Sequence, residues 1–134
     1  MNSQDFGFTE NELSHLTIGF AIEIHTAIGP GLLEKVYRDI LYHKLKKAGF
    51  YVEKEKKIAV KLEGIHFDYG YKADLIVENK LLIEVKTVER LMDKHFAQTL
   101  TYLRFGDYHL GLLINFNELL LKDGIRRVVN KFWK

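Results

Sequence analysis

The chain has 134 residues, of which 47% are hydrophobic and 28% are charged, so we expect one folded domain over residues 1–134. Cysteine is absent, which excludes disulfides, thiolate zinc sites, iron–sulfur clusters and a cysteine nucleophile. The net charge of +2 gives no strong pull on polyanions, and no apolar run approaches the roughly 20 residues that span a bilayer, so we expect a cytoplasmic protein with no membrane partner.

Two helices are predicted before residue 50, separated by Pro30. Residues 10–28 have helical length and apolar spacing, and residues 32–49 form an amphipathic pattern that ends at Gly49. After residue 50 the apolar period becomes that of strands. The remaining predicted elements are strands at 51–62, 65–77 and 81–87, a helix at 90–105, a buried strand at 108–116, and a short strand or tail at 124–133.

The order of these elements predicts a mixed α/β fold in which helices flank a central mixed sheet. Fold class alone does not give function, so the polar residues inside the apolar elements carry the functional argument.

The strands 65–77 and 81–87 place charged residues among aliphatic ones. If Glu78-Asn79-Lys80 forms a three-residue loop, residue 77 faces 81 and Asp74 lies opposite Glu84. Lys86 then shares the face of Glu84. A two-residue loop would send Glu84 to the other face, so this arrangement needs an odd loop or a bulge.

Two adjacent carboxylates repel each other unless a cation joins them. Carboxylate oxygens suit Mg²⁺ or Mn²⁺, with water and a substrate phosphate completing the octahedron. The nearby Lys86 could orient the attacking water or stabilise charge on phosphorus. The pattern therefore indicates metal-assisted phosphodiester chemistry, and the alternative is a structural Asp–Lys or Glu–Lys pair at a strand end.

Further polar positions lie on the predicted helices. On the second helix Glu34 falls between Leu41 and Leu45 at the edge of the apolar face, whereas the polar arc holds Lys35, Arg38, Asp39 and Lys46. Glu34 should therefore point toward the sheet, and the alternative is a border residue paired with a lysine.

On the third helix Gln98 and Tyr102 share one face. They either position a phosphate or a water molecule, or form a hydrogen bond at the edge of the core. His95 shares this face and is either close to the phosphate or a surface residue. Tyr69, Tyr71, Tyr102 and Phe105 could stack on bases, or belong to the core.

These residues resemble the PD-(D/E)XK nuclease superfamily. "ADL" followed by "EVK" looks like its Asp…Glu-x-Lys core, and "QTLTY" looks like the Gln-x-x-x-Tyr motif of its RecB-like branch. "GLLEKVY" (31–37) matches the motif that names the GxxExxY family. The blocks of that family follow in order over most of the chain, roughly from Leu13 to Val129, although Ala73 stands where the wider motif has proline.

The resemblance implies a restriction-endonuclease-like α-β-β-β-α-β core with an additional N-terminal helix. It implies Mg²⁺- or Mn²⁺-dependent hydrolysis of DNA rather than RNA, with a role in DNA repair, recombination or defence. Asp74, Glu84 and Glu34 would be the metal ligands, and Lys86 the catalytic lysine. Gln98, Tyr102 and Tyr37 would support the site or bind substrate. Relatives with an iron–sulfur cluster use cysteines that this chain lacks, so no cluster is expected.

A second hypothesis is a non-catalytic nucleic-acid-binding or assembly module that keeps the nuclease fold. Its motivation is the short chain, which leaves little surface for target selection. A homodimer or a partner protein would then supply that selection. Retention of Asp74, Glu84 and Lys86 argues against this alternative, because buried charges are costly to keep without a use.

Overall fold

The computed structural model describes residues 7–131 and shows two helices before the sheet. Helix α1 (Glu10–Ile28) covers the predicted range, and helix α2 (Glu34–Lys47) begins two residues later than its apolar pattern. A capping box starts α1, because the Thr9 hydroxyl accepts the Glu12 N–H and the Glu12 carboxylate accepts the Thr9 N–H. The helices are joined by a loop at 29–33 that holds Glu34 at the first turn of α2.

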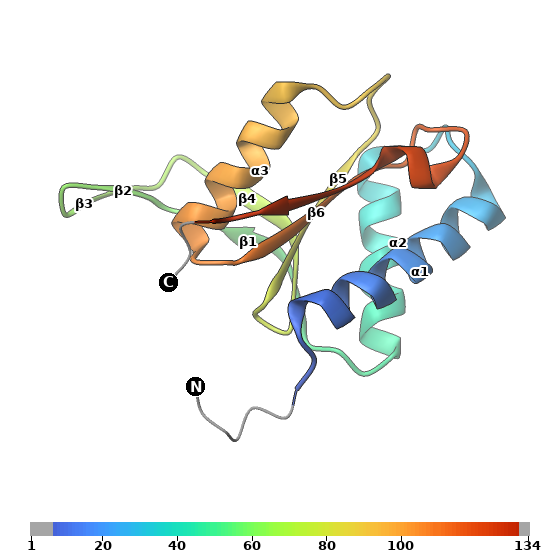
Figure 1. The fold of residues 1–134 in the computed structure, drawn as a ribbon, viewed down its shortest axis with the longest axis horizontal. Coiled ribbons are helices and arrows are strands. Elements are labelled where there is room, and N and C mark those ends of the chain that lie inside the picture. The colour runs from blue at the N-terminus through green and yellow to red at the C-terminus, as the bar shows by residue number, and fades with distance from the viewer. Residues whose placement is uncertain (1–6, 132–134) are drawn as a thin grey trace.

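A five-stranded sheet forms the centre, in the order β1-β4-β5-β6-β7. Its strands are β1 (Val52–Lys57), β4 (Lys72–Val77), β5 (Leu81–Lys86), β6 (Leu110–Asn115) and β7 (Ile125–Val129). Only β5 and β6 pair in parallel, and helix α3 (Asp93–Gly106) makes the crossover between them. The predicted mixed sheet flanked by helices is therefore confirmed (Figure 1).

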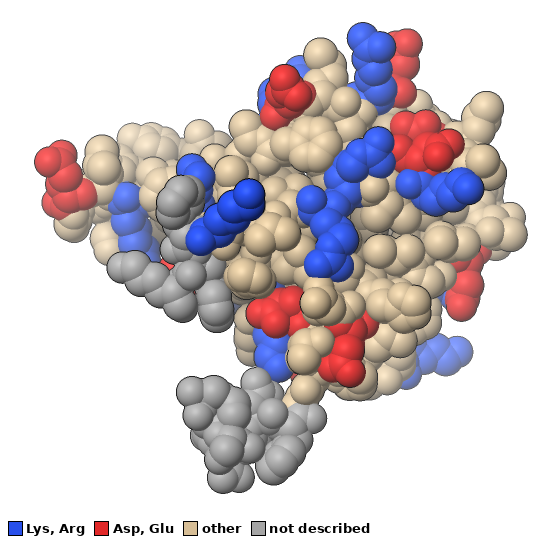
Figure 2. All heavy atoms as spheres, viewed as in Figure 1, with Lys and Arg blue, Asp and Glu red and all other residues tan. Residues whose placement is uncertain are grey.

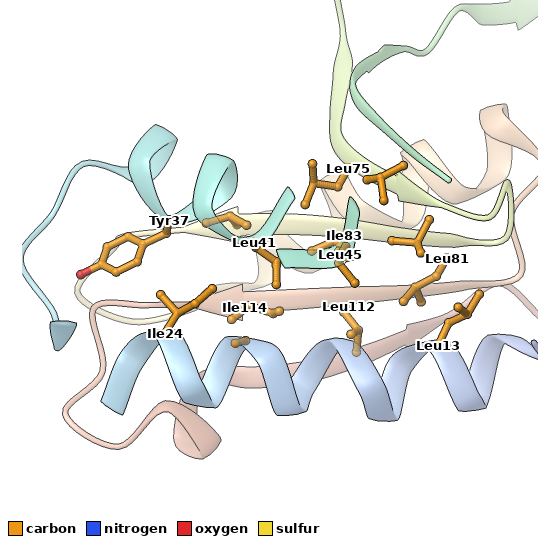
Figure 3. Packing of buried hydrophobic residues seen from close by; sticks show 14 of the residues in the cluster. Leu13, Ile24, Tyr37, Leu41, Leu45, Leu75, Leu81, Ile83, Leu112 and Ile114 are labelled. Carbon is orange, nitrogen blue, oxygen red and sulfur yellow. The ribbon is translucent and has the colours of Figure 1, made fainter. Parts of the chain in front are cut away.

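Helices cover both faces of this sheet. Alternate residues of β4, β5 and β6, among them Leu75, Ile83 and Leu112, pack against α1 and α2 (Figure 3). The intervening residues, such as Leu82 and Leu113, pack against α3. The alternation follows from the two-residue period of a strand and gives the molecule two apolar cores.

The close approach of α3 to the sheet depends on Gly111 in β6. A methyl group at this glycine would lie 3.2 Å from Cγ2 of Thr99 and 3.3 Å from a Cδ of Leu103. Real side-chain contacts are rarely so short, so a larger residue would require Thr99 and Leu103 to shift by a few tenths of an ångström. Gly111 thereby allows α3, which carries Gln98 and Tyr102, to pack closely against β6.

Helix α3 begins at Asp93 rather than at the predicted residue 90. The segment before α3 is held by the buried Asn115, whose amide oxygen accepts the Val88 N–H (3.1 Å) and whose amide nitrogen donates to the Val88 carbonyl (2.9 Å). These hydrogen bonds tie the backbone that leads into the helix to β6. Pairing with a distant asparagine leaves no trace in the local apolar pattern.

The two long strands predicted at 51–62 and 65–77 are each broken into two pieces. The outer pieces, β2 (Val60–Leu62) and β3 (Ile65–Phe67), form a separate two-stranded sheet. The predicted turn at Glu63 and Gly64 joins them, with φ values of 51° and 78° that suit such a tight hairpin. Figure 1 shows this β2–β3 arm extending away from the rest of the molecule.

The end of the described chain runs through a short 3₁₀ helix (Leu121–Gly124) into β7, so the short strand expected at 124–133 forms over 125–129. Phe132 and Trp133 lie outside the described residues. Basic and acidic side chains are mixed on the face seen in Figure 2, as the small net charge suggests. Within residues 7–131, no helix has both the length and the apolar character needed to cross a membrane.

Candidate active site

The ladder between β4 and β5 stops where two acidic residues face each other. The register pairs Val77 with Leu81 and Leu75 with Ile83, so the next position would pair Asp74 with Glu84, as the three-residue loop predicts. There the side chains replace the backbone ladder. The Asp74 N–H donates to Oε2 of Glu84 (2.8 Å), and the Val85 N–H donates to Oδ2 of Asp74 (2.7 Å).

This exchange fixes both carboxylates side by side at the point where the strands separate. One oxygen of each accepts a backbone N–H, and no hydrogen bond within residues 7–131 engages the other oxygen. Two carboxylates thus present their remaining lone pairs from a rigid base. The position of each group is determined by the backbone of the opposite strand.

Burial makes these carboxylates hard to ionise. Burial first, and then the charge of Asp74, raise the pKa of Glu84 to about 8. Burial is also the largest cause that raises the pKa of Asp74, to about 6, and the charge of Glu34 adds to it. Hydrogen bonds from the backbone and the charge of Lys86 act in the opposite direction on both groups. A pair with this electrostatic environment is stabilised by a nearby cation.

Lys86 lies at the end of β5 and is held by α3. Its Nζ donates to Oε1 of Gln98 at 2.8 Å. Tyr102, one turn further along α3, is 6% exposed, and burial first, then the charges of Glu84 and Asp74, raise its pKa. Gln98 therefore contacts the lysine of the site, and Tyr102 is close enough to both carboxylates for their charges to raise its pKa.

Glu34 approaches the same site from the first turn of α2. It is half-buried, and its negative charge raises the pKa of both Asp74 and Glu84. The three carboxylates nevertheless do not form one ligand shell, since no group of three His, Asp or Glu side chains in residues 7–131 is arranged to hold a metal ion. The structure thus brings Asp74 and Glu84 together and leaves Glu34 as a neighbouring charge.

The sequence of this chain matches a known protein family over most of its length. The family described as the PD-(D/E)XK nuclease superfamily matches residues 11–128. The chain belongs to the PD-(D/E)XK nuclease superfamily. Nucleases of this superfamily act on nucleic acids and generally use divalent metal ions.

Two solved structures share the fold of this superfamily member. The crystal structure of SSO0001 is similar over 90% of this chain and 59% of its own, with 22% identity and a TM-score of 0.54. An alkaline exonuclease (LHK-Exo) from Laribacter hongkongensis is similar over 98% of this chain and 73% of its own, with 11% identity and a TM-score of 0.51. The chain thus spans about three fifths of the length of SSO0001. No curated protein sequence matches.

The donor set of this nuclease-superfamily chain fits a hard divalent cation. Asp74 and Glu84 each offer an oxygen that no described residue engages, and Mg²⁺ commonly takes only one or two carboxylates from the protein. Waters and substrate phosphate oxygens supply the other positions. Two carboxylates are therefore enough to bind a divalent cation, and binding does not require Glu34 as a third ligand.

Tyr37, which the GxxExxY resemblance predicts to support the site, lies in the apolar core. It is fully buried, its ring stacks on Phe116 with centroids 4.5 Å apart, and its hydroxyl donates to the Gly29 carbonyl (2.5 Å). The same hydroxyl accepts the Leu32 N–H (3.2 Å). Tyr37 therefore fixes the loop that delivers Glu34.

Arg38 is buried, and its predicted position on the polar arc of α2 is wrong. The helical wheel puts it on the polar arc, but it is 8% exposed. It is buried because its guanidinium pairs with Asp39 (2.9 Å) and Glu55 (3.0 Å), and the second partner comes from β1. Its positive charge also lowers the pKa of Asp74. A partner 17 residues away gives no signal in the local pattern.

His95 lies near the site as well, with a local structural contact. Its Nδ1 accepts the Met92 N–H at 2.8 Å, which helps to start α3. Burial first, and then the charges of Lys86 and Lys94, lower its pKa.

Glu84→Gln is expected to stabilise the metal-free protein at alkaline pH. The raised pKa means that folded Glu84 keeps its proton above the value of 4.5 where the unfolded residue loses it, so stability falls as pH rises from about 4.5 to about 8. Glutamine has no such penalty and can still accept the Asp74 N–H. We expect a gain on the order of 2 kcal/mol in the free energy of unfolding.

Urea unfolding in EDTA at pH 5 and at pH 8.5 measures this effect. From pH 5 to pH 8.5, the urea concentration at the unfolding midpoint should decrease more for wild type than for Glu84→Gln. The exposed Glu89 offers a matched control, since Glu89→Gln should follow the wild type. If the stability of Glu84→Gln and of wild type depended equally on pH, the raised pKa would not belong to Glu84.

Proposed function

We propose that this chain is a metal-dependent nuclease that hydrolyses DNA phosphodiester bonds. In this proposal residues 1–134 form one nuclease domain, Asp74 and Glu84 hold Mg²⁺ or Mn²⁺, and Lys86 is the catalytic lysine. The observation that carries the proposal is the separation of β4 and β5, which fixes two carboxylates with free oxygens beside an ammonium group. Membership of the nuclease superfamily supports it.

The residues then have distinct chemical roles. A bound divalent ion would supply an activated water and neutralise phosphate charge. Water adds to phosphorus while the bond to the leaving ester oxygen breaks. Lys86 donates a hydrogen bond to a non-bridging oxygen of the phosphate as negative charge develops there. Gln98 holds the Nζ of Lys86 in place (2.8 Å), and Glu34 adds negative charge that favours cation binding.

The finer classification is part of the same proposal. Gly31, Glu34 and Tyr37 match the GxxExxY motif. The hydrogen bonds of Tyr37 give that motif a physical basis, because they fix the loop that precedes Glu34. Gln98, which accepts a hydrogen bond from Lys86, and Tyr102, whose pKa is raised by the charges of the two carboxylates, support assignment to the RecB-like branch. A role in DNA repair, recombination or defence, and a homodimer or partner protein for target selection, belong to this proposal.

A cleavage assay tests the proposal directly. Wild-type protein is incubated with circular single-stranded DNA, linear duplex DNA and RNA of matched length, in Mn²⁺, Mg²⁺ or EDTA at one salt concentration. We expect DNA products with either metal and none with EDTA. Binding of DNA without products in any metal would favour the non-catalytic binding module, and equal cleavage in EDTA would overturn the metal-dependent mechanism.

A further inference from the structure

An apolar pocket lies between α3 and the strand ends that lead into the β2–β3 arm. Its volume is about 360 Å³, and Ile58, Val60 and Phe105 form much of its wall. Two tyrosine rings, Tyr71 and Tyr102, line it as well, with centroids 6.3 Å apart and planes tilted by 48°. Tyr71 is 46% exposed, so part of its ring is available to a ligand.

This pocket adjoins the candidate active site through Gln98. Gln98 lines the pocket, and its Oε1 also accepts the hydrogen bond from Nζ of Lys86. Thr101, an exposed residue one turn of α3 from Gln98, adds a hydroxyl to the wall. A ligand in the pocket would therefore find apolar and aromatic walls and a few hydrogen-bonding groups beside the catalytic lysine. A nucleobase has these properties, with a flat π surface and a polar edge.

We propose that this pocket binds one unstacked base of the substrate strand, adjacent to the phosphate that is cut, with Tyr71 as the stacking platform. The inference rests on the proposed function and deepens it, because it makes single-stranded or frayed nucleic acid the substrate class. A base held in a duplex cannot enter a pocket of this kind without being unpaired. The occupant is therefore a nucleotide of the substrate strand.

Equilibrium binding of a short fluorescent oligonucleotide tests the inference, at one salt concentration and in EDTA so that no cutting occurs. Tyr71→Ala should weaken binding of single-stranded DNA by about 5- to 150-fold, the range found for loss of one base–aromatic stack. Tyr71→Phe, which keeps the ring, should bind like wild type. Tyr51→Ala is the matched control and should bind like wild type, because Tyr51 is 53% exposed and does not line the pocket. Binding of blunt duplex DNA should differ little among these proteins.

A scan with abasic nucleotides locates the base. With wild type, removing the base at one position should weaken binding by a similar factor, and with Tyr71→Ala the same removal should have no further effect. Equal binding of Tyr71→Ala and wild type, or equal losses on single-stranded and blunt duplex DNA, would overturn the base pocket and leave the proposed nuclease standing. Absence of any nucleic-acid binding or cleavage by wild type would overturn both.

Discussion

Asp74→Asn is expected to abolish binding of Mn²⁺ to the protein and to lower DNA cleavage by about 100-fold or more. The asparagine keeps the shape of the side chain, and its carbonyl oxygen can still accept the Val85 N–H that holds Asp74 in wild type (2.7 Å). It cannot supply a negative charge to a cation. Loss of the metal removes several kcal/mol of transition-state stabilisation, and each 1.4 kcal/mol or so is a factor of ten in rate.

Calorimetric titration of Mn²⁺ at one pH and salt concentration, paired with the cleavage assay, measures both effects. Asp68→Asn is the matched control, since Asp68 is exposed and its carboxylate caps Gly70 (3.1 Å) away from the site. If neither wild type nor Asp74→Asn binds the ion alone, the titration is repeated with bound DNA, whose phosphate can complete the coordination shell. Undiminished cleavage by Asp74→Asn would remove this residue from the mechanism.

The register of the acidic pair could be predicted from sequence because it depends on local information. The apolar alternation of the two strands and a three-residue connection suffice to place Asp74 opposite Glu84. The loop itself has φ values of 55° at Glu78 and 56° at Asn79, which a tight connection between strands requires. The types and order of the helices and strands around the site follow from equally local patterns.

The separation of the strands at the site could not be predicted in this way. Leu75 and Val77 pack with α1 and α2, but Ala73, which a regular strand would place on the same face, packs in the core beneath α3. In β1, Glu55 has a φ of 56° between the pairs Lys54–Leu75 and Lys56–Ala73. The strands therefore change face beside Asp74, and a two-residue period contains no signal of such a change.

The burial of Arg38 depends on the same irregularity of β1 at Glu55. Its partner Glu55 is the residue with the irregular backbone, and their ion pair (3.0 Å) joins α2 to β1 beside Asp74. Backbone strain of this kind costs roughly 1–3 kcal/mol and persists where surrounding contacts hold it in place. The irregular strand and the buried ion pair thus support each other, and both act at the acidic site.

Lys86→Met is expected to lower DNA cleavage by about 100- to 1000-fold while Mn²⁺ still binds. Methionine keeps most of the apolar stem but removes the ammonium group, which Gln98 holds at 2.8 Å in wild type. Removing one preorganised donor from a charge-stabilising site has an effect of this size. The charge of Lys86 also lowers the pKa of Asp74 and Glu84, so the variant should need a somewhat higher pH to bind the ion.

Single-turnover cleavage and calorimetry at pH 7 and pH 9 separate these two effects. At pH 9, Mn²⁺ affinity should return toward the wild-type value while the cleavage defect persists, because deprotonation restores the ligands but not the donor. Lys122→Met, at an exposed position in the 3₁₀ helix, serves as the control and should cleave like wild type. Recovery of cleavage in parallel with affinity at pH 9 would mean that Lys86 acts only by keeping the carboxylates ionised.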